Sequence, residues 1–312
     1  MSIAAIIPTY NAAAFLEGTL ASVNTQTLKP DEVIVVDDAS TDDTAAIARR
    51  LGATVIVLPQ NSGGPAVPLN TGIAVAKSDW IATLDHDDRW RPDWLATAAE
   101  AATLAKVEFV FGRVNAVPAN ADMQATLDAI GSSFRERGDA GAAQRIAHGE
   151  AYRRLADGRS YAVTCSNMLF TRRLGTAVPF DPTVSRCCDF RFTQQVTHDH
   201  DIAFANTVSC DWVNSPTSLY QQGSMDKLDR DLMTTFKQFD VSLFKTHFPQ
   251  WQSLRQNCRK TANDLAFAAR NRGEYRRSFT DYCDSVRYGG FNRTALLGMV
   301  KLPLLMLRGP RS

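Results

Sequence analysis

Short apolar runs alternate with stretches of helical periodicity over the first 112 residues. Residues 3–7 form an apolar run that Pro8 ends, and "EVIVVDD" (residues 32–38) is apolar through its middle, which is typical of a parallel strand buried on both faces. Between these runs, residues 12–23 have the spacing of a helix with one apolar face. The alternation predicts further strands and helices: strands over "TVIVL", "WIATLDHDD" and residues 107–111, and helices over "STDDTAAIARRLG", residues 65–76 and residues 92–104.

Strands that alternate with helices predict an α/β fold, in which a mostly parallel central sheet is flanked by helices through right-handed crossovers. Ligands of such sheets bind beyond the carboxyl ends of the strands. Asp37 and Asp38 follow the second predicted strand, and Asp85 and Asp87 end the fourth. We therefore expect these four carboxylates to lie at one edge of the sheet.

The acids of the fourth strand belong to the stretch "LDHDDRW", residues 84–90, which places Asp85, Asp87 and Asp88 within four positions. Helix capping needs only one side chain, and clustered carboxylates repel one another unless a positive partner neutralises them. A hard divalent cation with oxygen ligands is the natural partner, and Mg²⁺ usually completes its shell with substrate phosphates. The cluster therefore predicts Mg²⁺ or Mn²⁺ that bridges the protein to a diphosphate.

Composition narrows the function classes further. The chain has 312 residues, of which 45% are hydrophobic and 21% charged, and its net charge of +1 gives no reason to expect a nucleic-acid partner. Six cysteines show no CxxC spacing, which favours buried thiols in a reducing compartment over disulfides or a zinc site. The first residues read as a strand rather than a signal peptide, and no apolar stretch is long enough to span a bilayer. The expected location is therefore the cytoplasm.

Four motifs together resemble the family 2 glycosyltransferases: "IIPTYN", "VIVVDDASTDDT", "NSGGPAVPLNTGI" and "IATLDHDD", in this order. The resemblance is specific over residues 3 to about 112 and weaker to about residue 225. It implies the GT-A nucleotide-diphospho-sugar transferase fold over residues 1–225, with a nucleotide-sugar-binding half (1–112) and an acceptor half (113–225). Residues 226–312 lie outside it, and their spacing predicts a helical C-terminal extension.

The resemblance also implies roles for single residues. Asp37 or Asp38 would contact the nucleobase, Asp85 the ribose or the metal, and Asp87 the metal. The remaining residues implied to bind the nucleotide sugar are Pro8, Thr9, Tyr10, Asn61, Gly63 and Asn70. Leu69 stands where the family often has an arginine before this second Asn, so the chain lacks that contact to the diphosphate.

The acceptor half must supply a base, because inverting transfer requires a group that takes the proton of the attacking hydroxyl. "PFDPTVSRCCDFRF" resembles the family segment that carries the general base, which places Asp189 in that role and Cys188 where the family has a Glu. Without the resemblance, an Asp after a loop is usually a helix cap. Asp181 is the next candidate for the base.

Three downstream stretches need separate interpretation. "YQQGSMD" lacks the His that the family often has there, so Gln222 or water would complete the metal shell. "THDHD" (residues 197–201) has the composition of a metal motif, but we interpret it as a solvated turn. The tail "ALLGMVKLPLLML" is apolar and flanked by basic residues, which suits either the surface of an anionic membrane, through residues 295–312, or a helix docked on the protein.

Other classes fit less well. Aspartate-nucleophile phosphatases and receiver domains need an Asp at the first strand, where this chain has "PTYN", and a dinucleotide oxidoreductase needs G-x-G-x-x-G. Processive polysaccharide synthases share the first half of this chain but carry a "QxxRW" motif and membrane-spanning helices, and the sequence shows neither.

The hypothesis is an inverting, metal-dependent transferase of the bacterial surface-polysaccharide or exopolysaccharide type, peripheral on the inner membrane face. It would move one hexose from a nucleotide sugar, with UDP favoured, to a saccharide or lipid-linked saccharide. The alternative is a non-catalytic sugar-nucleotide-binding protein of the same fold.

Overall fold

The computed structural model describes residues 1–117, 124, 143–157, 164–213, 225–244 and 247–308, with the backbone alone at residues 157, 225, 248 and 303–308. It consists of two compact units. The first comprises residues 1–152 and 160–222, and the second comprises residues 153–159 and 223–312.

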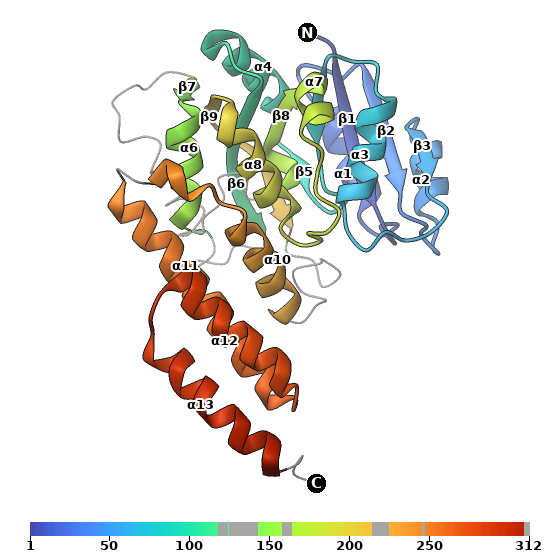
Figure 1. The fold of residues 1–312 in the computed structure, drawn as a ribbon. Helices are drawn as coiled ribbons and strands as arrows, with labels where there is room; N and C mark the ends of the chain where they lie inside the picture. Colours follow the sequence, from blue (N-terminus) through green and yellow to red (C-terminus); the bar gives the residue numbers. More distant parts are fainter. Residues whose placement is uncertain (118–123, 125–142, 158–163, 214–224, 245–246, 309–312) are drawn as a thin grey trace. The chain divides into compact units, whose positions relative to one another are not determined.

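The first unit is built around one mixed sheet (Figure 1). Its parallel part has the order β3-β2-β1-β4, made of β1 (Ile3–Thr9), β2 (Glu32–Asp37), β3 (Thr54–Val57) and β4 (Trp80–Thr83). Beyond β4 the order continues through β8 (Met168–Thr171), β6 (Phe109–Val117), β9 (Ile202–Val213) and β5 (Arg89–Trp90). The strand β8 is antiparallel to both β4 and β6, and β7 (Ala143–Ile146) pairs with β9.

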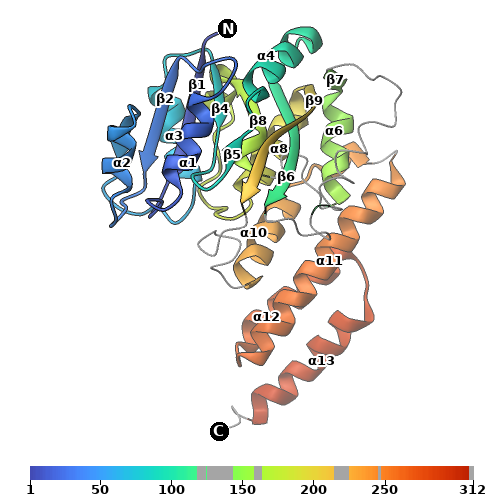
Figure 2. The ribbon, with the colours of Figure 1, turned by 180° about the vertical axis from the view of Figure 1, so that it is seen from behind.

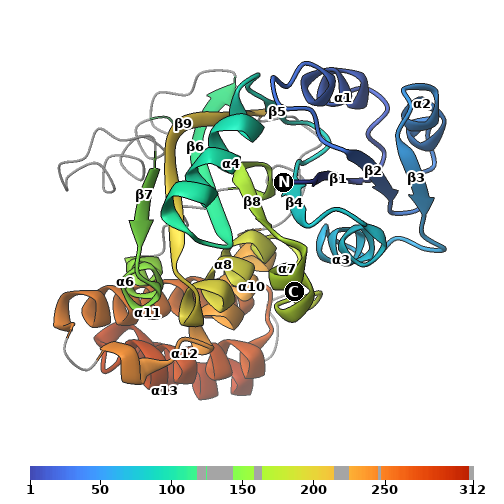
Figure 3. The same cartoon turned by 90° about the horizontal axis from the view of Figure 1, so that it is seen from above.

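Helices cover both faces of this sheet, because its strands are apolar on both sides (Figure 3). Ile3, Ala5 and Ile7 of β1 pack in one core with α1 (Leu16–Asn24), α2 (Thr44–Arg50) and α4 (Trp94–Ala105). The opposite face carries α3 (Ala66–Val75), α7 (Arg172–Ala177) and α8 (Cys188–Asp199), where Phe180 and Phe192 stack at 4.1 Å. This arrangement confirms the predicted α/β architecture.

Some predicted boundaries differ from the structure. The fourth strand ends at Thr83, so the acidic cluster lies in a turn that the Asp88 N–H closes by donating to the Asp85 carbonyl (3.1 Å). The stretch before β8 is a 3₁₀ turn, η2 (Cys165–Asn167). The turn predicted for "THDHD" is wrong at its start, because α8 continues through Asp199.

The second unit is helical, which confirms the predicted C-terminal helical extension. It contains α10 (Met225–Lys237), α11 (Phe248–Asn271), α12 (Tyr275–Gly289) and α13 (Arg293–Arg308), together with the short turns η1 (Leu155–Asp157) and η3 (Val241–Phe244). Figure 2 shows α11, α12 and α13 side by side. Gly298 of α13 lies against the ring of Tyr282, where a Cβ would come within 2.3 Å. Among the described helices, none combines the length and the apolar character needed to cross a bilayer.

Candidate active site

Two buried aspartates end β2, next to the end of β1. Asp37 is 2% exposed and accepts hydrogen bonds from the hydroxyls of Thr9 (3.4 Å) and Ser40. The Asp38 N–H donates to the Thr9 carbonyl (2.8 Å), which extends the β1–β2 ladder by one residue. Asn11 and Ala39 follow these strands with φ values of 48° and 60°, in a region that L residues seldom adopt and that is enriched at functional sites.

The Asp38 carboxylate anchors the loop that begins the third crossover. It accepts from the Ser62 N–H (3.0 Å) and the Ser62 hydroxyl (2.9 Å), and the Asn61 amide donates to the Asp38 carbonyl (3.4 Å). Burial raises the pKa of Asp38, and the negative charge of Asp37 adds to this, against the opposing effect of the Ser62 hydrogen bonds. The turn continues at Gly63, whose φ of +84° suits glycine.

Pro8, Tyr10 and Asn70, which are also predicted to bind the nucleotide sugar, differ in their exposure and in their hydrogen-bond partners. Tyr10 is 44% exposed, whereas the Pro8 carbonyl contacts Nδ1 of His86 (3.3 Å) and so links β1 to the acidic turn. Asn70 bonds Phe180 in both directions, since its Oδ1 accepts from the Phe180 N–H (2.9 Å) and its Nδ2 donates to the Phe180 carbonyl (2.8 Å). Asn70 thus fixes the segment that leads to Asp181 and α8.

In the acidic turn, the three carboxyl groups have different environments. Asp88 is fully buried and accepts from the Ser166 hydroxyl (2.6 Å) and the Val213 N–H (2.8 Å). Burial, reinforced by the charges of Asp85 and Asp87, raises the pKa of Asp88 well above its usual range. Asp88 therefore has a higher affinity for a proton than an ordinary carboxyl group, whereas its hydrogen bonds to Ser166 and Val213 oppose this increase.

Asp85 is held from the acceptor half of the chain. Its Oδ2 accepts from the Thr164 hydroxyl (2.7 Å), and its N–H donates to Oγ of Ser166 (2.9 Å). Burial raises the pKa of Asp85, and the charge of Asp87 raises it further, although the Thr164 hydrogen bond opposes this. A bound cation would relieve the repulsion between Asp85 and Asp87.

Asp189 lies in the first turn of α8, beside this cluster. Its carboxylate accepts from the Phe190 N–H (2.7 Å). Burial raises the pKa of Asp189 to about 7, and the charge of Asp85 contributes to that increase, so the two carboxyl groups belong to one electrostatic site. The Sγ atoms of Cys165 and Cys188 lie 3.9 Å apart, and the charges of both acids affect these thiols.

The pKa of Asp181 is shifted in the opposite direction to that of Asp189. Burial alone would raise its pKa, but two hydrogen bonds from Thr183 and the charge of Arg191, 3.6 Å away, hold the pKa below its usual value. A carboxylate that is paired in this way has a low affinity for protons. Of the two candidates for a base, Asp189 is therefore the better suited.

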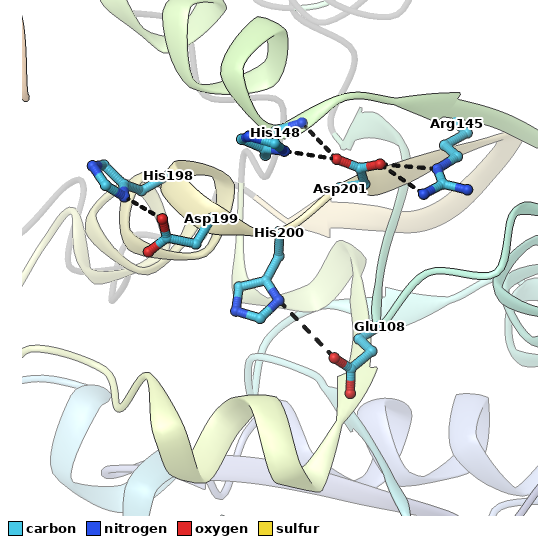
Figure 4. Close-up of polar contacts among 7 residues, drawn as sticks. All are labelled: Glu108, Arg145, His148, His198, Asp199, His200 and Asp201. Carbon is cyan, nitrogen blue, oxygen red and sulfur yellow. Dashed lines mark hydrogen bonds and ion pairs between the residues drawn. The ribbon is translucent and has the colours of Figure 1, made fainter. Parts of the chain in front are cut away.

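The histidines of "THDHD" do not converge on one point (Figure 4). Nδ1 of His198 contacts Asp199 (2.8 Å), and Nδ1 of His200 lies 4.0 Å from Glu108. Asp201 accepts instead from His148 (3.0 Å to Nδ1) and from Arg145. The four side chains thus belong to three separate contacts rather than one cluster, which argues against a shared metal.

One pocket lies away from the acids. It has a volume of about 580 Å³ and opens at the other edge of the sheet, beside Trp80 at the start of β4 and Thr171 at the end of β8. Its polar groups already bind one another: Thr171 and Arg173 contact Glu108, and the Arg172 guanidinium donates to the Ser78 carbonyl (3.0 Å). These groups are therefore partly occupied by one another.

The candidate site thus combines predicted and unpredicted residues. The structure gathers Asp37, Asp38, Asp85 and Asp189 along the carboxyl edge of the parallel strands, whereas Gln222 lies outside the described residues. Thr164 and Ser166 were not predicted, because "TCSN" carries no motif that distinguishes it from an ordinary strand. Within the part of the chain that the structure describes, no three His, Cys, Asp or Glu side chains are arranged to hold a metal ion.

Comparison with known proteins identifies similar chains. Residues 4–169 match the family described as Glycosyl transferase family 2. The succinoglycan biosynthesis protein ExoW of Rhizobium meliloti is 39% identical over 105 residues, which are 31% of this chain and 33% of that protein. The putative teichuronic acid biosynthesis glycosyltransferase TuaG of Bacillus subtilis is 37% identical over 103 residues, 31% of this chain and 40% of that protein. The matched stretches thus span well under half the length of these relatives.

A solved structure is similar over nearly the whole chain. The crystal structure of S. aureus TarS 1-349 in complex with UDP-GlcNAc aligns with a TM-score of 0.60 and 15% identity. The alignment covers 97% of this chain and 92% of that one. At this identity the similarity defines the fold alone.

Proposed function

Because the chain belongs to glycosyl transferase family 2 and has the GT-A fold, we propose that it transfers one hexose, with inversion, from a nucleoside-diphosphate sugar to a saccharide acceptor. The favoured donor is a UDP-sugar, in line with the UDP-GlcNAc complex of the structurally similar TarS. The favoured acceptor is a growing, lipid-linked surface polysaccharide or exopolysaccharide, in line with the names of ExoW and TuaG.

The proposal depends chiefly on Asp189. A general base works best when its pKa is close to the working pH, and the pKa of Asp189 is about 7. In the proposed reaction, the Asp189 carboxylate takes the proton of the acceptor hydroxyl while that oxygen attacks the anomeric carbon. The bond to the nucleoside diphosphate breaks on the opposite face, and the leaving group departs as an anion.

The metal would bind at Asp85 and Asp87. Both follow β4 at the ligand edge, and their mutual repulsion supports a site for Mg²⁺ or Mn²⁺. When bound, the ion would neutralise the charge that develops on the diphosphate. The described residues supply these two carboxylates, and a shell of this kind usually draws its other oxygens from phosphates and water.

The nucleoside would lie against β1 and β2. Asp37 and Asp38 are the proposed contacts to the base, and Thr9 and Tyr10 line the same strand ends. The loop from Asn61 to Gly63 would lie beside the donor, since Asp38 anchors it. Asn70, whose amide already binds Phe180, would act by orienting that segment rather than by touching the sugar.

The outer face of α13 is the proposed membrane contact. Ala295, Gly298 and Leu302 point inward, which leaves Leu297 (46% exposed) and Val300 (68% exposed) on the other face. Arg293 and Lys301 are exposed on that same side, as suits an anionic lipid surface. Helix docking and membrane contact, posed as alternatives by the sequence, are therefore compatible. The proposed location is the cytoplasmic face of the membrane, as the free cysteine thiols suggest.

A non-catalytic sugar-nucleotide-binding protein is the alternative. The two differ in turnover: we expect slow, metal-dependent hydrolysis of UDP-sugars by the wild type, which EDTA and Asp87→Asn should each abolish. Asp43→Asn is the matched control, because Asp43 precedes α2 away from the acidic turn. Donor binding without any hydrolysis or transfer would favour the alternative, and full activity in EDTA would contradict the metal role.

A further inference from the structure

The hydroxyl group of Thr164 lies between two carboxyl groups of the acidic turn. Its Oγ1 is 2.7 Å from Oδ2 of Asp85 and 3.2 Å from Oδ2 of Asp88. A hydroxyl group donates only one hydrogen, and the shorter contact identifies Asp85 as its acceptor. The second contact then places Thr164 within hydrogen-bond reach of the buried Asp88 carboxyl group.

Asp88 connects three segments of the chain: its own turn, residues 164–166 and the end of β9. The Ser166 hydroxyl donates to its Oδ2 (2.6 Å) and the Val213 N–H to its Oδ1 (2.8 Å), and the backbone of Asp88 closes the turn with Asp85. The Ser166 N–H in turn donates to Oγ1 of Thr164 (3.1 Å). Asp88 and Thr164 are 0% and 4% exposed. Hence the Thr164 hydroxyl is fixed by partners on both sides.

We infer that Thr164 is a positioning residue, which fixes the Asp85 carboxylate for the donor, and that Asp88 is its buried anchor. One oxygen of Asp85 is engaged by Thr164, so the carboxylate cannot rotate freely and its other oxygen faces a ligand with one orientation. Whether that oxygen binds a metal or a ribose rests on the proposed function. The geometry of Thr164, Asp85 and Asp88 is independent of that function.

The chain offers a conservative series for the test. Thr164→Val keeps the shape and removes the hydroxyl, whereas Thr164→Ser keeps the hydroxyl. Thr197→Val is the matched control, because Thr197 is also buried, but its hydroxyl donates to the Thr193 carbonyl (2.7 Å) within α8. Affinity for UDP is measured by calorimetry with and without Mn²⁺, and melting temperature without ligand.

We expect Thr164→Val to bind UDP about tenfold more weakly, the loss usual for one hydrogen bond to a charged group. Thr164→Ser and Thr197→Val should bind within about twofold of the wild type, well below such a loss. A loss confined to the samples with Mn²⁺ means that Asp85 acts through the metal, and a loss in both means that it contacts the nucleotide; either supports the inference.

Two results would overturn it. Wild-type affinity in Thr164→Val shows that Asp85 needs no positioning. A loss in Thr164→Ser as large as in Thr164→Val, with the same fall in melting temperature, shows a role in folding only. A wild-type protein that binds none of UDP, GDP and dTDP refutes the proposed function itself, and this inference with it, which distinguishes that failure from the other two.

Discussion

Replacing Asp189 with Asn tests the base directly and has two opposite consequences. Asn keeps the shape of the side chain but cannot take a proton. Loss of a general base costs ~10²–10⁴ in rate, so we expect Asp189→Asn to turn over at least about a hundredfold more slowly, the low end of that range. Because UDP is proposed to bind at the strand ends and the acidic turn, its affinity should barely change.

The same substitution should stabilise the fold at high pH. The pKa of Asp189 is about 7 in the folded protein, against an ordinary 3.8. Each pKa unit corresponds to ~1.4 kcal/mol, so the difference amounts to ~4 kcal/mol. The folded state keeps a proton that the unfolded chain releases near pH 4. The stability linked to that proton is complete below pH 4 and is lost as the pH rises through 7.

The assay compares unfolding free energies of wild type and variant between pH 4 and 9. We expect Asp189→Asn to gain stability relative to the wild type as the pH rises to about 7, and the kcat/KM of the wild type to rise over the same range. Asp181→Asn is the control, since Asp181 is paired with Arg191 and should be dispensable for turnover. A kcat of Asp189→Asn within about threefold of wild type, or a stability difference independent of pH, would refute the reasoning.

Three further predictions concern other parts of the chain. Asp38→Ala should weaken UDP binding about tenfold, because the Ser62 hydrogen bonds that anchor the adjacent loop are lost. Unchanged affinity for UDP would mean that the nucleobase binds elsewhere. Val300→Asp should reduce sedimentation with anionic liposomes, whereas Thr103→Asp, with the same charge at an exposed site of α4, should reduce it less; equal effects would indicate electrostatics alone. Burial opposes but does not outweigh the His148 and Arg145 hydrogen bonds, which lower the pKa of Asp201 to about 2. Asp201→Asn should therefore cost ~1 kcal/mol near pH 6, and the difference should vanish as the pH falls towards 2; a constant difference would exclude the ion pair as its cause.

The parallel half of the fold could be predicted because its signals are local. The strands β1, β2 and β4 are apolar runs, and each is followed by residues of helical spacing, so periodicity alone places Asp37 and Asp85 at one edge. The strand β8 could not be placed in this way. Its position between β4 and β6 depends on pairing across about 60 to 90 residues, which no local pattern encodes.

The same limit applies to the site. Asp189 was found by resemblance, and its pKa near 7 follows from burial in the first turn of α8 and from the charge of Asp85, which the sequence does not reveal. The burial that raises the pKa of Asp88 and the hydrogen bonds of Thr164 and Ser166 depend on contacts between side chains nearly 80 residues apart. A cluster of three acids in sequence thus becomes one half-buried carboxyl group, Asp85, and two buried ones, Asp87 and Asp88.

The central position of β8 has a consequence for how the protein is made. Until residue 171 has left the ribosome, β4 lacks its partner β8. The backbone N–H and C=O groups on that side of β4 can then pair with a strand of another chain. The nascent chain must therefore keep an open edge through more than 80 further residues of synthesis. A fragment that ends at residue 117 would retain that edge permanently, and such an edge is a template for aggregation. We therefore expect residues 1–117, although their motifs are contiguous in sequence, not to fold as an independent piece.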